Sequence, residues 1–149
     1  MISFFSQDID FKLNKRRSYK KWFSETARQK GQKIASLAVV FCSDSYILAL
    51  NRRFLGHDYC TDVIAFDARL PHERQIKGAS DGIEGDIFIS IDTVRANAAF
   101  YGVPFAKELG RVMIHGLLHL LGYGDITPKE KALMTKEEDK ALLFLATIA

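Results

Sequence analysis

The residue types best suited to chemistry stand in one segment, His-Gly-Leu-Leu-His-Leu-Leu-Gly-Tyr-Gly-Asp, which begins at His115 and ends at Asp125. His115 and His119 are four residues apart. On a helix such residues lie about 40° apart around the axis, so both imidazoles project from one face. Gly122 can adopt the left-handed conformation that ends a helix, and Gly124 adds a second permissive joint. The chain can therefore double back and bring Asp125 to the same point.

Two imidazoles and a carboxylate that meet in this way predict a site for one divalent metal, with zinc as the expected ion. Catalytic zinc typically has three protein ligands and one open position, where the pKa of bound water falls to roughly 7. The carboxylate of Asp125 leaves the site one positive charge poorer than a third histidine would. A less acidic water and an altered metal preference are therefore expected. The same ligand types also describe non-haem iron sites.

An isolated HxxxH pair belongs more often to an apolar helix core than to a metal site. Here the two glycines, the carboxylate and the cost of burying unpaired imidazoles favour the metal. Gly116 occupies the position at which HExxH zinc proteases place their glutamate general base, so peptide hydrolysis of that kind is disfavoured. No general base can be identified from the sequence.

Strands and helices alternate around this segment. Apolar and β-branched runs predict strands at 2–5, 34–41, 62–66 and 86–91, with a polar loop over 67–84. Helical spacing predicts a first helix with an apolar stripe that Gly31 ends; the stripe consists of Tyr19, Trp22, Phe23 and Ala27. A second helix is capped by Ser43 or Asp44 and closed by Gly56; its inward residues are Ile47, Leu50 and Phe54.

Three more helices are expected in the second half of the chain. Asp92 caps a helix to about Tyr101, and Pro104 opens the metal-binding segment, which runs to Leu121. Thr127 to Glu130 form a capping box that starts the last helix. The residues of this helix expected to pack are Leu133, Met134, Ala141 and Leu145.

The length and composition limit the classes of protein to which this chain can belong. At 149 residues with 48% hydrophobic content, the chain fits one domain with a sizeable core. No run reaches membrane-spanning length, and the apolar start is shorter than a signal peptide requires, so a soluble cytoplasmic protein is expected. Cys42 and Cys60 lack CxxC spacing, which favours buried free thiols over a disulfide.

The segment between residues 12 and 33 is strongly basic, because it contains nine basic residues and only one acidic residue. Lys15, Arg16 and Lys20 are candidates to contact RNA phosphates. Taken alone, the segment reads as an ordinary solvated helix face, and it gains meaning only beside a catalytic site.

The metal-binding segment resembles the HGxLHLxGYDH signature of the YbeY-type endoribonucleases, the bacterial ribosomal RNA maturation factors. Further blocks match in order: Leu50-Asn51 with Thr61 to Phe66 resemble "LN…PTDVLSF", the stretch 85–90 resembles "GDIxIS", and Met134 with Glu138 match "M…E". The resemblance implies an α+β fold: a zincin-like single domain, with a mixed sheet of about four strands and surrounding helices. It also implies a metal-dependent single-strand ribonuclease that acts on small-subunit ribosomal RNA.

Three positions depart from the family pattern. The third ligand is Asp125 where the family has histidine, and a carboxylate is also a legitimate zinc ligand. Leu55 stands where the family carries an arginine implicated in cleavage, which removes a cation that would stabilise the phosphoryl transition state. Arg52 or Arg53 could replace it, although on a helix they point elsewhere. Cys60 replaces a proline, which relaxes a turn and can place a thiol near the site.

Other polar residues border the matched blocks. Thr61, Asp62 and Asp86 could line the cleft, with strand-end hydrogen bonding as an equal alternative. His57 and His72 fall in predicted loops, where histidine is usually a solvated side chain, and His57 is the more interesting because it neighbours a matched block. Arg53 and Asp86 are the candidate catalytic residues besides the ligands, and Arg52 and Arg53 are candidate RNA contacts.

The preferred reading is a zinc-dependent endoribonuclease in 16S ribosomal RNA maturation and ribosome quality control, with the small ribosomal subunit as partner and no DNA or membrane partner. A second reading is a ribosome-associated RNA-binding or assembly factor whose metal is mainly structural, which the Leu55 replacement favours. A third is another metallohydrolase or an iron oxygenase.

Overall fold

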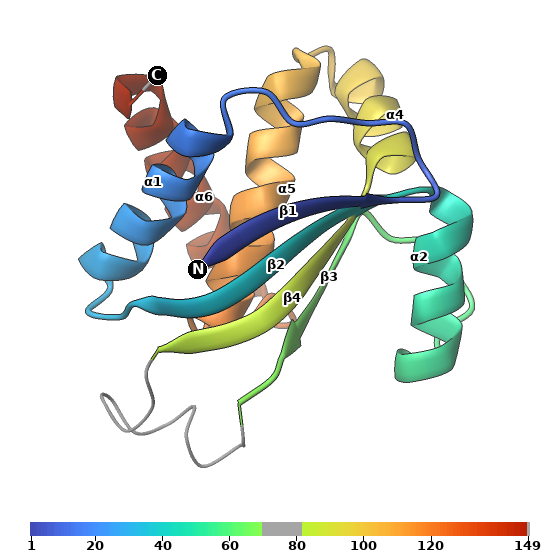
Figure 1. The fold of residues 1–149 in the computed structure, drawn as a ribbon, viewed down its shortest axis with the longest axis horizontal. Helices are drawn as coiled ribbons and strands as arrows, with labels where there is room; N and C mark the ends of the chain where they lie inside the picture. Colours follow the sequence, from blue (N-terminus) through green and yellow to red (C-terminus); the bar gives the residue numbers. More distant parts are fainter. Residues whose placement is uncertain (70–81, 149) are drawn as a thin grey trace.

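The computed structural model describes residues 1–69 and 82–148, and Figure 1 shows a mixed sheet with helices around it. The strands are β1 (Ile2–Gln7), β2 (Ile34–Cys42), β3 (Val63–Asp67) and β4 (Ile83–Ser90), in the order β1-β2-β4-β3. β1, β2 and β4 are parallel, whereas β3 is antiparallel to β4 and forms one edge. This arrangement confirms the predicted mixed sheet of four strands in an α+β domain.

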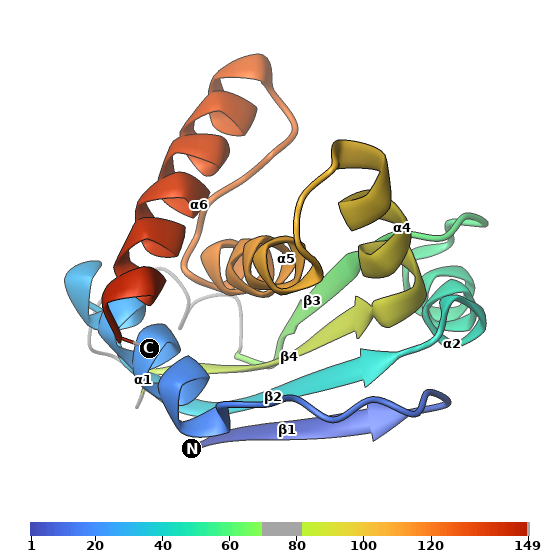
Figure 2. The ribbon, with the colours of Figure 1, turned by 90° about the horizontal axis from the view of Figure 1, so that it is seen from above.

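The helices surround this sheet. They are α1 (Arg16–Gln29), α2 (Asp44–Leu50), α4 (Ile91–Tyr101), α5 (Phe105–Leu120) and α6 (Pro128–Ile148). A π-helical turn, η1 (Asn51–Leu55), continues α2. Figure 2 shows α4, α5 and α6 over the same face of the sheet. No helix of the described residues is long and apolar enough to cross a membrane.

Alternation along the strands gives the sheet two apolar faces. Ile87 and Ile89 point into the main core, while Ile64 and Phe88 join a smaller cluster with Ile47 of α2 on the other face. α2 therefore covers the face opposite α5. Helices thus cover the first face and part of the second, where Phe5 of β1 stays exposed.

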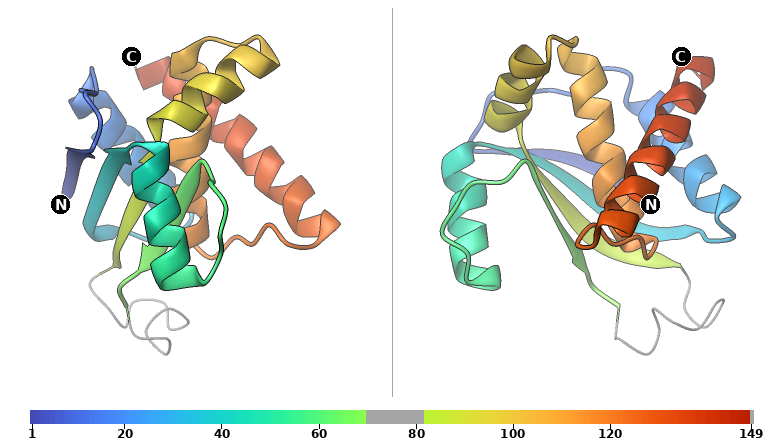
Figure 3. Two further views of the ribbon diagram at one scale, coloured as in Figure 1. Left: turned by 90° about the vertical axis from the view of Figure 1, so that its right-hand side faces the viewer. Right: turned by 180° about the vertical axis from the view of Figure 1, so that it is seen from behind.

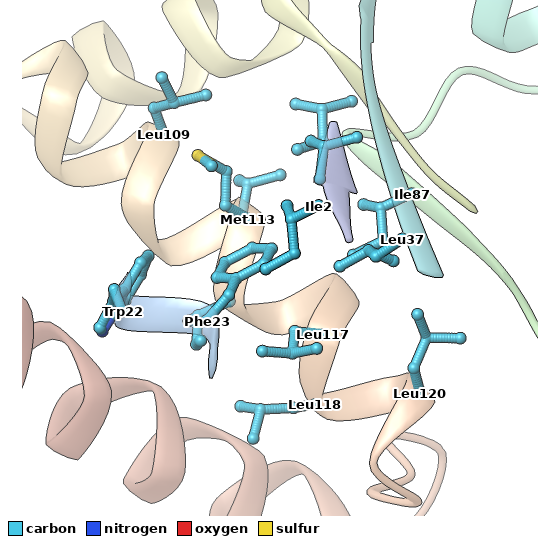
Figure 4. Packing of buried hydrophobic residues seen from close by; sticks show 14 of the residues in the cluster. Ile2, Trp22, Phe23, Leu37, Ile87, Leu109, Met113, Leu117, Leu118 and Leu120 are labelled. Atoms are coloured by element: carbon cyan, nitrogen blue, oxygen red, sulfur yellow. The ribbon is translucent and has the colours of Figure 1, made fainter. Parts of the chain in front are cut away.

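Helix α5 is the centre of the main core. Leu117 and Leu118 are fully buried, and Figure 4 shows them with Met113, Trp22 and Phe23 between the helices and the sheet. Burial of each such side chain contributes about 1.5–3 kcal/mol. The helix on which the metal ligands lie is therefore held by packing along its length.

Several predicted boundaries are confirmed by local hydrogen bonds. Ser43 caps α2 by accepting from the Tyr46 amide at 3.1 Å. The Thr127 amide donates to Glu130 Oε1 at 2.9 Å and the Glu130 amide donates to Thr127 Oγ1 at 3.1 Å, which is the predicted capping box. Gly31 and Gly56 take positive φ where the first two predicted helices end.

Other predictions were wrong in detail. The N-cap of α4 is Ser90, whose hydroxyl accepts from the Thr93 amide at 3.2 Å, and Asp92 already lies inside the helix. Phe54 and Leu133, both expected to pack inward, are 57% and 46% exposed. Cys42 is buried, but Cys60 is exposed.

The predicted loop over 67–84 is shorter at both ends. β3 extends to Asp67 and β4 begins at Ile83, so strand structure occupies residues that the polar composition assigned to the loop. The segment 70–81, which contains His72, lies outside the described residues.

Candidate metal centre

The two predicted imidazole ligands lie on the last turns of α5, and the chain reverses directly after them. The amide of Tyr123 donates to the Leu118 carbonyl at 3.0 Å, and that of Gly122 donates to the His119 carbonyl at 3.1 Å. This is the Schellman arrangement, and it requires the positive φ of 108° that Gly122 adopts. The reversal carries Asp125 back to the helix, as the glycines predicted.

The three predicted ligands converge. His115 Nε2 and His119 Nε2 are 3.0 Å apart, and Asp125 Oδ2 lies 3.2 Å from the first and 3.3 Å from the second. Metal–ligand bonds of about 2.0–2.2 Å in a tetrahedral site place ligand atoms roughly 3.3–3.6 Å apart. The donor set and its spacing fit one zinc-sized cation. Because the three side chains are only half-buried, solvent can reach a further coordination position.

Each imidazole is oriented by a hydrogen bond at its other nitrogen. His115 Nδ1 lies 2.6 Å from Glu138 Oε2, and His119 Nδ1 lies 3.0 Å from the carbonyl oxygen of Tyr123. Both partners accept, so each Nδ1 carries the proton and each Nε2 lone pair faces the cation position. Such partners hold metal-binding histidines in the required tautomer and orientation.

Glu138 belongs to a wider charged network. It is buried, and its second oxygen accepts from Arg111 Nη1 at 3.0 Å. Burial lowers the pKa of His115, but the hydrogen bond to Glu138 and the negative charges of Glu138, Asp62 and Asp125 together leave that pKa raised. Glu138 therefore increases the basicity of the ring that it orients.

The loop that carries Asp125 is fixed on both sides. A Cβ at Gly124 would overlap the Glu130 carboxylate, which occupies the space beside the loop as part of the capping box. On the helix side, Arg69 Nη2 donates to the Leu120 carbonyl at 2.9 Å. The first turn of α6 and the residue after β3 therefore restrict the chain on either side of the carboxylate ligand.

Three cavities formed by the described residues contain a predicted ligand, and the smallest of them, about 240 Å³, is lined by His119 with Asp67 and Arg69. The other two border different ligands. The larger of these two, about 600 Å³, is lined by His115 and Asp125 together with the cations Lys107 and Arg111. Its wall also holds carboxylates, among them Asp62 and Glu108. Burial raises the pKa of both, and neighbouring carboxylates raise them further.

The smaller of these two, about 320 Å³, lies on the side of His119. Tyr59, His57, Leu55 and Thr61 are among its lining residues. No lysine or arginine is among the described residues that line it. The candidate centre therefore separates a charged cavity from one of largely neutral character.

The remaining predicted residues lie at different distances from this centre. Asp62 lines the larger cavity and Thr61 the smaller one, whereas Asp86 lies within β4 and lines neither. Arg52 pairs with Asp58 at the surface. The guanidinium of Arg53 lies 5.2 Å from the centre of the Phe54 ring. Neither arginine lines a cavity that contains a ligand.

The predicted RNA contacts on α1 are exposed and lie near its start. Lys15 lines a third cavity of about 580 Å³, which it shares with Lys107 and Arg111. Those two cations also line the cavity of His115. Lys107, Arg111 and His115 succeed one another at intervals of four residues on one face of α5. Basic side chains therefore extend from the start of α1 towards the metal ligands, and Arg111 among them pairs with Glu108 and Glu138.

Sequence reasoning did not assign site roles to Glu138, Lys107, Arg111 or Tyr59. A signal for Glu138 was present, because it shares a helix face with Met134 and Ala141, both buried. A carboxylate on a buried face requires a partner. The two cations could have been found by extending the histidine spacing backwards along α5. The position of Tyr59 depends on an irregular loop and left no periodic signal.

An α+β domain with two helical histidines and a returning aspartate defines a metal-dependent hydrolase. The family model described as Endoribonuclease YbeY matches residues 2–146, so the chain belongs to the YbeY endoribonuclease family. This confirms the resemblance seen in the sequence.

Similar proteins cover nearly the whole chain. The Endoribonuclease YbeY of Cytophaga hutchinsonii is 45% identical over 95% of this chain and 93% of its own length. That of Phocaeicola vulgatus is 41% identical over 98% of this chain and 99% of its own. The solution structure of TM1509 from Thermotoga maritima superposes with a TM-score of 0.64 at 25% identity, covering 97% of this chain and 89% of that one. The fold and the family therefore agree.

Proposed function

We propose that the protein is a zinc-dependent endoribonuclease that cleaves single-stranded ribosomal RNA in the cytoplasm, during 16S maturation and quality control of the small ribosomal subunit. The observation that carries this proposal is the convergence of two Nε2 atoms and one carboxylate oxygen within 3.3 Å of one another. His115, His119 and Asp125 would hold the ion. When bound, zinc supplies an acidified water and a Lewis acid for phosphodiester hydrolysis.

The residues around the ligands suit an RNA substrate. Lys107 and Arg111 lie in the cavity of His115, where they can attract phosphates. Lys15, Arg16 and Lys20 extend this attraction along α1. Asp62 lines the same cavity, and its raised pKa makes it the candidate to accept a proton from the attacking water. Gly116 cannot serve as a base and faces the sheet.

The test compares the parent protein with His115→Ala, purified side by side, on single-stranded RNA. We expect the parent to contain one zinc per chain by elemental analysis of anaerobically purified protein, which also distinguishes an iron protein. Chelator should abolish cleavage and zinc should restore it, whereas the variant should be inactive throughout. Equal cleavage by parent and variant would show that the activity comes from a contaminating nuclease.

A second candidate function is a ribosome-associated RNA-binding factor with a mainly structural metal. Leu55 favours it, because the cavity beside His119 has no cation among its described lining residues to stabilise a phosphoryl transition state. Arg53→Ala and Arg52→Ala test whether either arginine supplies that charge. RNA binding by the zinc-loaded parent without chelator-sensitive cleavage would favour this function over the nuclease.

A further inference from the structure

An exposed pair of aromatic rings stands beside one of the metal ligands. The rings of His57 and Tyr59 are stacked, with centroids 5.1 Å apart and planes 15° from parallel. The Tyr59 hydroxyl oxygen lies 3.0 Å from His57 Nδ1. Tyr59 is 56% exposed, although a large aromatic side chain usually gains by burial. Both residues line the cavity that contains His119.

The loop presents this pair in a defined position. Asn51, only 1% exposed, donates its side-chain amide to the Tyr59 carbonyl at 2.8 Å. Its own carbonyl accepts from the His57 amide at 3.1 Å. Gly56, with φ of 67°, makes the turn between them. A buried asparagine thus ties both ends of the ring pair to the π-helical turn, so the rings need little ordering before they bind a ligand.

The chemistry of the cavity selects the kind of group that fits it. Leu55 and the two rings supply apolar surface, and Thr61 supplies a hydroxyl. The backbone of β3 adds donors and acceptors: the bonds from Ser90 N to the Asp62 carbonyl and from Ala68 N to the Glu84 carbonyl place even-numbered residues against β4. The amides and carbonyls of Val63 and Ala65 therefore face the open edge, and both residues line the cavity.

These features match a nucleobase and not a phosphate. A base has a flat face that stacks on an aromatic ring and an edge that exchanges hydrogen bonds. A phosphate would find no lysine or arginine among the described lining residues here, whereas Lys107 and Arg111 face the cavity on the opposite side of the ligands. The two cavities therefore differ in chemistry as the base and the backbone of a nucleotide strand do.

We propose that the cavity bounded by Tyr59, His57 and the open edge of β3 binds the nucleobase next to the scissile phosphate, with that base stacked on Tyr59. The flanking backbone lies toward Lys107 and Arg111. This inference rests on the proposed ribonuclease function and adds to it the subsite that positions the strand and gives it base preference.

The test treats the tyrosine ring and the base as the two partners of a double-mutant cycle. Labelled oligoadenylates, each with one abasic residue at a different position, are tested for binding and cleavage by the zinc-loaded parent and by Tyr59→Leu. Stacking contributes enough that loss of either partner should weaken binding by roughly 5- to 100-fold. We expect one abasic position to matter in the parent, and to have no further effect in Tyr59→Leu.

Two further variants control for other causes. Tyr59→Phe keeps the ring and should behave as the parent does. Phe5→Leu removes an equally exposed ring, 51% exposed, from the opposite edge strand and should change neither binding nor cleavage. Thermal unfolding of each variant checks that the fold is retained.

Losses that simply add, so that the abasic position costs the same with and without the ring, would overturn the subsite. That result alongside chelator-sensitive cleavage by the parent leaves the ribonuclease function intact. Conversely, a parent that binds RNA with the expected ring and base coupling but does not cleave would refute the ribonuclease function, and with it the scissile phosphate beside the subsite, while still showing that Tyr59 stacks on a base.

Discussion

Glu138 and Tyr123 each accept a hydrogen bond from the Nδ1 atom of one histidine ligand and so orient its ring. One holds His115 with a charged carboxylate at 2.6 Å and the other holds His119 with a neutral carbonyl at 3.0 Å. The Tyr123 carbonyl lies in the turn that ends α5, four residues after His119, so its position follows from the local sequence. The carboxylate comes from another helix, and its charge raises the pKa of His115.

Substitution of Glu138 by Gln should weaken zinc binding by about 10- to 100-fold, because loss of the negative charge weakens the hydrogen bond that orients the His115 ring and reduces the basicity of that ring. Zinc affinity measured by competition with a chromophoric chelator checks this. Glu137→Gln is the matched control, since Glu137 is also buried on α6 but pairs with Lys30 and touches no ligand. A similar loss in both variants would mean that the effect comes from α6 as a whole.

Among the residues of the site, the sequence predicted those whose positions depend on local backbone structure. The three ligands stand within eleven residues, and helical spacing with two glycines suffices to bring them together. Glu138 approaches His115 through the packing of α6 on α5, which no spacing rule determines. The exposure of Cys60 also depends on tertiary structure.

Gly116 explains how α5 can lie so close to the sheet. A Cβ built at this residue would lie 2.7 Å from Ile87 Cγ2 and 3.2 Å from Val63 Cγ2. The position that carries glutamate in HExxH proteases therefore faces packed strands here, with no room for a longer side chain. Glycine at this position allows α5 to pack closely on the sheet, but the position then carries no side chain that could act in catalysis.

Gly116→Ala should therefore destabilise the fold by about 1–3 kcal/mol, the usual cost of overpacking a close-packed core. Urea unfolding measures this change. Gly110→Ala, on the same helix, is the control: its Cβ would meet the end of the flexible Leu142 side chain at 3.2 Å, and alanine gains about 1 kcal/mol in helix propensity. Equal stability of the two variants would contradict the proposed clash with β4.

Helices were predicted correctly where the hydrophobic pattern and the capping residues agree, as for α5 and α6. Phe54 was misplaced because residues Asn51–Leu55 form a π-helical turn, which changes the helical period that the prediction assumed. Leu133 lies near the start of α6, which projects away from the sheet in Figure 3. Ser90 replaced Asp92 as the cap because β4 runs directly into α4 without an intervening loop.

At the scale of the whole molecule, the metal should act as a cross-link between α5, the loop after it and, through Glu138, α6. A ligand that binds only the native state stabilises it by about 2.7 kcal/mol at a hundredfold excess over Kd. For a chain of this size that corresponds to a rise in Tm of about 5–11 °C.

Thermal unfolding with zinc or with chelator measures this shift. His119→Ala should abolish it, since a ligand is lost, whereas His57→Ala should retain it, because His57 lies outside the ligand set. A shift that persists in His119→Ala would place the stabilising zinc at another site.

The order of the site residues along the chain has a consequence for biosynthesis. A polypeptide is made from its N-terminus, and its early segments can begin to fold first. The sheet and both imidazoles precede Asp125 and Glu138 in the chain. A nascent chain therefore contains two of the three ligands before the third has been synthesised. The cation site should therefore become complete only after Asp125 has emerged, and the orienting contact of Glu138 only after α6 has packed on α5.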